Sequence, residues 1–348
     1  MNNVIYDLNK YSVNERNGTY GGKAGDKEGI TIDGNYWIVK YPKTTKGIEG
    51  DLVSYMTAPL SEYIGSHIYQ ILGMDVHETI LGVRNEKLVV ACKDFCKNEG
   101  ALREIRTVKN AYNKHLSEKL NESFSSTSSS HMVDINELLI RFKYNPILKD
   151  IQGIEERFWD LFIVDILINN NDRNDGNWGL LYEDGKYRLA PIFDNGAAFS
   201  NKLPDKKLEE FLSDDKKMEN STLNTTTIFG INGKSVHARD ILKLNYQGLN
   251  DAIKRVVPKI QEKMDDIRQF ILNIPTEYNN ILVCSDVRKN FYIKSMELRL
   301  NNFLIPALKK NSIVSLQEIE GNGQRDVEIT QKQGNRIKEN VKSQEKMI

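Results

Sequence analysis

The alternation of hydrophobic and polar positions over about the first ninety residues indicates β-strands with one helix among them. Two hairpins follow from this alternation and from the turn residues between the strands, Asp33-Gly34 being the stronger turn. Between the hairpins, apolar residues at helical spacing predict one helix, which Gly73 ends. The predicted elements are strands 29–33 and 35–41, helix 60–72, and strands 78–83 and 87–91.

The second of these strands carries a lysine among apolar residues. Trp37 and Val39 face one side of the strand, and Ile38 and Lys40 face the other. A lysine in such a strand is costly to bury unless it meets a negative group, and phosphates would meet that need. The alternative is an edge-strand lysine whose ammonium reaches water. Glu62 at the start of the next helix is a candidate partner, although an acidic residue there also favours the helix dipole by itself.

Beyond residue 130 the periodicity becomes helical. A serine-rich stretch, 123–130, precedes this part and is predicted to be a flexible loop or linker. Helix 155–168 is apolar nearly all round, so we expect it at the centre of a domain. The other predicted elements are helix 132–144, strands 178–182 and 186–190, helix 248–272, kinked or broken at Pro258, and helix 286–308.

A small sheet-rich half thus precedes a larger helix-rich half, which is an α+β arrangement. We expect a first domain at 1–95, a helical domain at 96–310 and a polar, flexible tail at 311–348. A ligand is expected in the cleft between the two halves.

The charge balance removes several classes of partner. The 348 residues include 48 Lys plus Arg and 48 Asp plus Glu, so the formal net charge is zero. This gives no electrostatic reason to expect nucleic acid or a membrane as partner. No apolar run reaches the roughly 18 residues of a membrane span, and the N-terminus lacks the basic head and apolar core of a signal peptide. We expect a cytoplasmic protein, with release by a non-classical route left open.

The three cysteines, Cys92, Cys96 and Cys284, are too few for a disulfide scaffold. Cys92 and Cys96 have no further cysteine or histidine at ligand spacing, so they form a poor zinc site. We expect packing or linker residues in a reducing compartment.

The strongest chemical pattern is Asp172-Arg173-Asn174-Asp175-Gly176-Asn177, which follows the apolar helix and precedes a hairpin and Asp194. Phosphoryl transfer from ATP needs a carboxylate near the accepting hydroxyl and hard oxygen ligands for magnesium. Asp172 and Asn177 have the Asp-x-x-x-x-Asn spacing of a kinase catalytic loop. The hairpin is expected to fold Asp194 back beside Asn177. Loops also favour Asn, Asp and Gly for their own turn chemistry, which is the alternative for the hexapeptide alone.

Two further segments are candidates for nucleotide contact. Residues 18–29 are rich in glycine and stand directly before the lysine hairpin, where backbone amides could cover phosphates; a plain flexible turn is the alternative. Residues 87–95 pass from a buried strand into the linker between the halves, where backbone groups would meet adenine, although a buried strand and turn would look the same. The candidate residues in these segments are Gly21, Gly22, Lys23, Ala24, Gly25, Ala91, Cys92 and Lys93.

Together these motifs resemble the HipA-like serine/threonine kinases, most closely the short CtkA-type branch. The resemblance spans about residues 17–199 and continues more weakly to about 306. It is carried by Tyr20-Gly21-Gly22 with Gly25, Trp37-Ile38-Val39-Lys40-Tyr41-Pro42, Ser61-Glu62-Tyr63, Val89-Val90-Ala91-Cys92-Lys93-Asp94-Phe95, Phe158-Trp159-Asp160, Asp172-Arg173, Gly176-Asn177-Trp178-Gly179 and Ala190-Pro191-Ile192-Phe193-Asp194.

The resemblance implies a two-lobed protein-kinase-like fold that binds ATP and Mg2+ and acts on serine and threonine of a protein substrate. Lys40 would contact the phosphates and Glu62 would pair with it. Asp172 would be the catalytic base, and Asn177 and Asp194 the magnesium ligands. The glycine-rich residues would lie over the phosphates.

The sequence departs from the family in three places. Many relatives have histidine where this chain has Asn174, so an orienting role of that imidazole is in doubt. The glycine-rich loop begins about twenty residues in, without the subdomain that longer HipA proteins place before it, so an antitoxin partner is not assumed. Family members can autophosphorylate a serine of this loop, whereas this loop has Thr19 and Tyr20 but no serine.

Two other functions stay open. A small-molecule kinase of the aminoglycoside or choline type shares the two aspartates and the asparagine, but its usual acidic pocket is not evident in the mixed charges after Asp194. A nucleotide-binding interaction module without catalysis is the second alternative. The kinase hypothesis predicts autophosphorylation as well as transfer to a protein.

Overall fold

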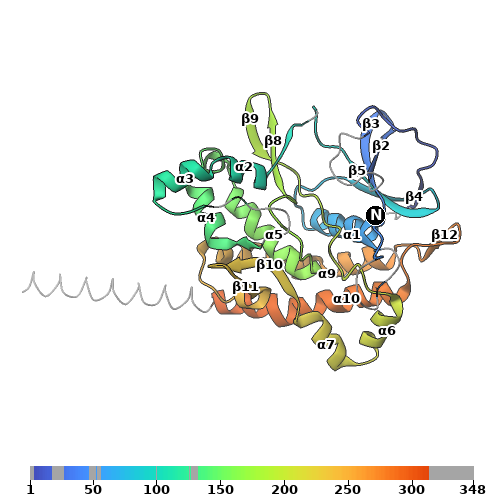
Figure 1. Cartoon of the computed structure of the whole chain (residues 1–348). Helices are drawn as coiled ribbons and strands as arrows, with labels where there is room; N and C mark the ends of the chain where they lie inside the picture. Colours follow the sequence, from blue (N-terminus) through green and yellow to red (C-terminus); the bar gives the residue numbers. More distant parts are fainter. Residues whose placement is uncertain are drawn as a thin grey trace, which may run out of the picture.

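The structure is a computed structural model in which a sheet-rich N-terminal part precedes a helical C-terminal part (Figure 1). This mixed composition is the one predicted. The described residues are 4–17, 27–46, 52, 56–98, 100–124, 126 and 132–312. Most of the serine-rich stretch and the tail from residue 313 lie outside them. So do the predicted phosphate-covering residues Gly21, Gly22, Lys23, Ala24 and Gly25.

The N-terminal sheet has five strands in the order β1-β4-β5-β3-β2 and contains both predicted hairpins. Asp33 and Gly34 both have positive φ, as the tight turn between β2 and β3 requires. β3 lies between β5 and β2, so Lys40, opposite Val90, is not on an edge strand and that alternative is wrong. The strands are β1 Tyr6–Asp7, β2 Lys27–Ile32, β3 Asn35–Lys40, β4 Thr79–Arg84 and β5 Lys87–Lys93.

The two faces of this sheet bury different residues. Trp37 and Val39 pack with Ala91 in a small core on one face, as the alternation predicts. On the other face, helix α1 (Ala58–Ile71) packs against β4 and β5 and also contacts the helical part (Figure 1). The predicted end of this helix is confirmed, since Gly73 adopts φ +73° and donates its N–H to the Gln70 carbonyl.

The helical part is built around α5 (Ile154–Ile168), in which eleven of 15 residues are buried, as its apolar surface predicts. α9 (Gln247–Leu272) packs along it and continues through Pro258, so the helix is not broken there. A proline costs the helix one hydrogen bond, and the buried Val256, Val257 and Ile260 around it offset that cost. The other predicted helices are α4 (Ile135–Tyr144) and α10 (Asp286–Arg299), which runs on into a π-turn at Leu300–Leu304.

Short, mostly polar elements escaped prediction. They bury only a few side chains each, such as Leu208 and Met218, so no periodic stripe marks them. They are α2 Ile105–Ala111, α3 Asn113–Leu120, a 3-10 turn Leu148–Asp150, α6 Asp205–Leu212, α7 Asp215–Leu223, α8 Ala238–Ile241, a sheet of β7 Val133–Asp134, β10 Thr226–Ile231 and β11 Lys234–His237, and the hairpin β12 Glu277–Tyr278 with β13 Ile281–Leu282.

A second small sheet leads into a segment that bonds to the N-terminal part. The predicted hairpin is present as β8 (Gly179–Glu183) and β9 (Lys186–Leu189), with β6 (Leu102–Glu104) pairing on the other side of β8. After β9, Ile192 accepts a hydrogen bond from the His77 N–H and forms a bridge with Val76, just before β4. The chain that leads to Asp194 is therefore bonded to the N-terminal part.

Candidate active site

The ammonium of Lys40 lies between two carboxylates. Its Nζ is 3.0 Å from Glu62 Oε2 and 2.9 Å from Asp194 Oδ1. Lys40 ends β3, Glu62 belongs to α1, and Asp194 follows β9, so the fold gathers three distant segments. The Glu62 side chain is 2% exposed and the Asp194 side chain is 42% exposed. The structure thus pairs Lys40 with Glu62, as the resemblance implies.

All three groups are held in their charged forms. Burial by itself lowers the pKa of Lys40, but Asp194 and Glu62 outweigh it and raise that pKa well above the usual value. Burial likewise opposes the charge on Glu62, while Lys40 and His77 hold its pKa well below the ordinary range. Lys40 also lowers the pKa of Asp194. Because one lysine faces two carboxylates, the cluster of Lys40, Glu62 and Asp194 has a net negative charge. Asp194 is the more exposed of the two carboxylates and can therefore bind a cation.

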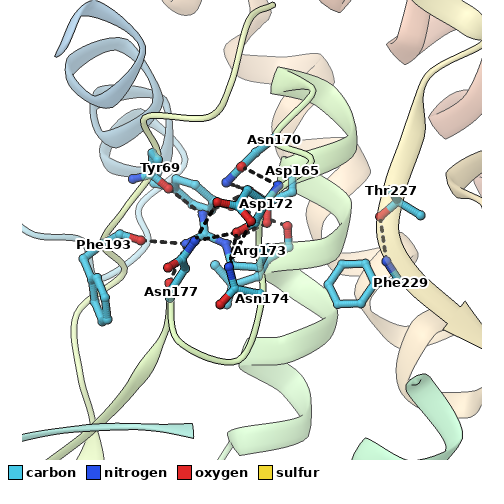
Figure 2. Close-up of polar contacts among 12 residues, drawn as sticks. Tyr69, Asp165, Asn170, Asp172, Arg173, Asn174, Asn177, Phe193, Thr227 and Phe229 are labelled. Carbon is cyan, nitrogen blue, oxygen red and sulfur yellow. Dashed lines mark hydrogen bonds and ion pairs between the residues drawn. The ribbon is translucent and has the colours of Figure 1, made fainter. Parts of the chain in front are cut away.

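The loop that carries Asp172 is organised by its own asparagines. α5 ends at Ile168 and is capped by Asn169, which has φ +54°. The buried Asn170 side chain then donates to Asp165 Oδ1 at 3.1 Å and accepts from the Asp172 N–H at 3.3 Å (Figure 2). Asn174 donates its amide to Asp172 Oδ1 at 2.9 Å and accepts the Gly176 N–H at 2.9 Å. The Asn174 amide therefore orients the exposed Asp172 carboxylate.

Arg173 ties this loop to the segment that carries Asp194. Its guanidinium is fully buried and pairs with Asp165, at 2.8 Å from Nε to Oδ2. It also donates to the carbonyl oxygens of Asn177, at 2.8 Å, and Phe193, at 2.6 Å (Figure 2). Sequence reasoning gave Arg173 no role. The sequence did contain a signal for such a role: Asp165 lies inside an apolar helix, and a buried carboxylate requires a cationic partner such as Arg173.

The donor set beside Arg173 fits a magnesium ion. The Asn177 amide nitrogen donates to the Asp172 carbonyl oxygen at 2.5 Å. Its carbonyl Oδ1 and the Asp194 Oδ2 have no hydrogen-bond partner among the residues that the structure describes. Amide and carboxylate oxygens are the hard ligands that magnesium prefers. The shared contact with Arg173 brings the Asn177 backbone next to that of Phe193, immediately before Asp194.

A second cluster, Glu62, His77 and Cys92, has its ligand atoms within 4.8 Å of one another but does not suit a metal. Both Glu62 oxygens already accept hydrogen bonds, from Lys40 on one side and from His77 and Asn195 on the other. Burial raises the pKa of the Cys92 thiol far above its usual value, so the thiolate that a metal binds is disfavoured. The cluster is better described as a hydrogen-bonded network behind Lys40.

The residues predicted to lie near adenine occupy the end of β5. Ala91 is fully buried in the core on the face opposite α1, and Cys92 pairs with Ile38 on one side and Thr79 on the other. Lys93 forms an exposed ion pair with Glu78 at 3.0 Å. Their contact with a nucleotide stays a prediction. The three cysteines are free, as expected.

The described part of the chain contains no helix long and apolar enough to cross a membrane.

Comparison with known proteins finds similarity both in sequence and in structure. No family model matches the sequence. The chain is 29% identical over 316 residues to serine/threonine-protein kinase CtkA of Helicobacter pylori (strain J99), covering 89% of this chain and 90% of that protein. The crystal structure of the H. pylori proinflammatory kinase CtkA matches with a TM-score of 0.76 and 26% identity, over 90% of this chain and 99% of that one. HipA of Shewanella oneidensis MR-1, solved with HipB and operator DNA, is more distant, with a TM-score of 0.46 and 12% identity over 84% of this chain and 69% of that one. In sequence and in fold the chain is therefore similar to the serine/threonine-protein kinase CtkA, the resemblance that the motifs predict.

Proposed function

We propose that this chain is an ATP- and Mg2+-dependent protein kinase that transfers the γ-phosphoryl group to serine and threonine hydroxyls. The observation that carries this proposal is the gathering of Lys40, Glu62 and Asp194 into one contact cluster. Arg173 joins the loop of Asp172 and Asn177 to the same segment. In this proposal the sheet-rich and helical parts are the two lobes, and the nucleotide lies between them.

Each polar group has a distinct task. Asp172, exposed and oriented by Asn174, accepts or orients the acceptor hydroxyl. Lys40 stabilises the charge of the transferring phosphoryl group, and Glu62 holds Lys40 in place. Magnesium held by Asn177 and Asp194 would neutralise phosphate charge. Positioning by these fixed groups supplies most of the rate enhancement.

The proposal is tested by incubating the chain with γ-labelled ATP, magnesium and a generic basic protein. We expect label on serine or threonine of the added protein, and on the chain itself through autophosphorylation. The matched variant Asp194→Asn keeps the size of the side chain and removes its charge, so transfer should fall to background while the thermal unfolding midpoint stays close to that of the parent.

Three outcomes would contradict the proposal. Label on aminoglycosides or choline but not on protein would identify a small-molecule kinase. Nucleotide binding without turnover on any acceptor would identify an interaction module. Transfer by Asp194→Asn at the parental rate would remove Asp194 from the metal site.

Mapping the labelled residues in the same reaction also shows whether Thr19 takes the place of the missing loop serine.

A further inference from the structure

A buried histidine contacts the Lys40–Glu62 pair from the side away from Lys40. His77 stands just before β4, and its side chain is 3% exposed. Its Nε2 lies 3.0 Å from Glu62 Oε1 and 3.0 Å from the Ser66 hydroxyl oxygen. Since Glu62 uses Oε2 for Lys40, the histidine contacts the oxygen that the lysine leaves free.

The same oxygen has a second donor from the segment of Asp194. The Asn195 N–H donates to Glu62 Oε1 at 3.0 Å, and the Asn195 side-chain amide donates to the Ser66 hydroxyl at 3.0 Å. The last torsion of a glutamate side chain is soft and broadly distributed. Two donors on one oxygen restrict that torsion, so the other oxygen keeps a defined direction toward Lys40.

His77 is itself held by the backbone near Asp194. Its N–H donates to the Ile192 carbonyl oxygen at 3.0 Å, two residues before Asp194 in the chain. Its backbone therefore follows the Asp194 segment while its side chain holds Glu62. Loss of the hydrogen bond between the His77 imidazole and Glu62 would therefore shift Lys40 relative to Asp194. The effect would pass through Glu62, because the described hydrogen bonds and ion pairs of the His77 side chain include neither Lys40 nor Asp194.

We propose that His77 is a positioning residue for phosphoryl transfer, and this inference rests on the function proposed above. Its Nε2–H fixes the Glu62 carboxylate, and through it the Lys40 ammonium, at the place where the transferring phosphoryl group is stabilised. Because an ionised carboxylate only accepts hydrogen bonds, the imidazole must carry its proton on Nε2.

The test compares three variants with the parent chain. His77→Gln places an amide donor close to the position of Nε2, whereas His77→Phe fills the space without a donor. His67→Phe is the matched control, because His67 lies on α1, stacks on Phe270 at 4.9 Å between ring centroids and bonds to the Tyr63 carbonyl rather than to Glu62. The measurements are kcat, the KM for ATP, and the rate at which an amine-reactive reagent labels Lys40, read by mass spectrometry.

We expect His77→Phe to lower kcat about tenfold or more, the usual scale of one hydrogen bond to a charged group. The KM for ATP should change less, because the lysine charge remains in the site. Lys40 should be labelled several times faster, since a displaced Glu62 no longer engages its ammonium in a hydrogen bond. His77→Gln should recover most of both effects, and His67→Phe should stay within about twofold of the parent.

The inference is overturned if His77→Phe matches the parent in kcat and in labelling, if His77→Gln is no better than His77→Phe, or if His67→Phe is equally impaired. If His77→Phe does not fold, His77→Asn replaces it, because it carries the same amide as His77→Gln one methylene short. A parent chain without phosphoryl transfer would refute the proposed function, while the labelling of Lys40 would still decide whether His77 holds the pair.

Discussion

The two polar networks of the site are built in opposite ways. Around Asp172 the contacts are local, since its carboxylate meets Asn174 two positions on and its carbonyl meets Asn177 five positions on. Around Lys40 they are long-range, since Glu62 and Asp194 lie 22 and 154 positions away. The first network needs only the turn chemistry of one loop. The second requires the sheet, α1 and the chain after β9 to be packed together.

The networks also differ in what their loss would cost. Asp172 is exposed, so breaking its contacts frees a carboxylate that water can solvate. Glu62 is almost completely buried, so removing its partner leaves a charge without compensation. We therefore expect changes around Asp172 to affect rate with little effect on stability, and changes that leave the buried Glu62 without Lys40 to affect both.

The largest expected effect is on rate alone, at Asp172. Asp172→Asn keeps the shape of the side chain and removes its capacity as a base, so phosphate transfer should fall by about 10²–10⁴-fold. ATP affinity and the unfolding midpoint should hardly change, as fluorescence titration and thermal melts can measure. Transfer at the parental rate would take Asp172 out of the mechanism.

Lys40→Met should lower both rate and stability. We expect a loss of about 10²-fold in transfer and of about 3 kcal/mol in the free energy of unfolding near neutral pH. Most of the stability loss comes from Glu62, because Asp194 is 42% exposed and solvent screens it. Lys294→Met, which breaks an exposed ion pair with Asp215 at 2.8 Å, is the matched control and should change stability by less than about 1 kcal/mol.

The fall of unfolding free energy at acidic pH also tests the ion pairs of Lys40. Lys40 holds the pKa of Glu62 and of Asp194 below their unfolded values. Their contribution is therefore present above the unfolded pKa values, 4.5 and 3.8, and is lost as pH falls through the lower folded ones. Urea unfolding between neutral and acidic pH should show a smaller loss of stability for Lys40→Met than for the parent. If the free energy of unfolding fell equally steeply with pH in the parent and in Lys40→Met, Lys40 would not stabilise the two carboxylates.

A smaller effect on rate is expected at Asn174. Asn174→Asp keeps the oxygen that accepts the Gly176 N–H and replaces the amide that donates to Asp172 with a second carboxylate. Transfer should fall about tenfold or more, because one hydrogen bond to a charged group is lost and the new carboxylate repels that of Asp172. Steady-state kinetics measures it. Unchanged kcat would show that Asp172 needs no orienting donor.

The last expected effect is on stability alone, at the contact between α1 and the Asp194 segment. A Cβ on Gly65 would lie 2.8 Å from Asn195 Cβ, so the helix approaches the loop more closely than an alanine permits. Gly65→Ala should lower the free energy of unfolding by about 1–3 kcal/mol through this overpacking. The higher helix propensity of alanine should offset part of that loss. Gln70→Ala, at an exposed position of the same helix, is the control in urea unfolding.

The elements that the sequence predicts well are those whose signal lies within the element itself. Both hairpins of the first sheet, α1 and the central helix α5 follow from alternation, periodicity and turn residues, and the structure contains all of them. The short helices α6 and α7 were missed because each buries only one or two side chains. Helix 248–272 was expected to be kinked or broken at Pro258; the break is wrong, because packing on both sides of the proline sustains one continuous α9.

By itself the sequence determined the secondary structure with strong periodicity and the order of acids and amides in the loop 172–177, since these depend on residues near one another in the chain. Only the tertiary structure decided that the ammonium of Lys40 meets two carboxylates, that Arg173 joins Asp165 to the Asp194 segment, and that His77 contacts Glu62. The physical reason is that a buried charge is stabilised by whichever opposite charge or donor packs against it, and here those partners come from distant segments.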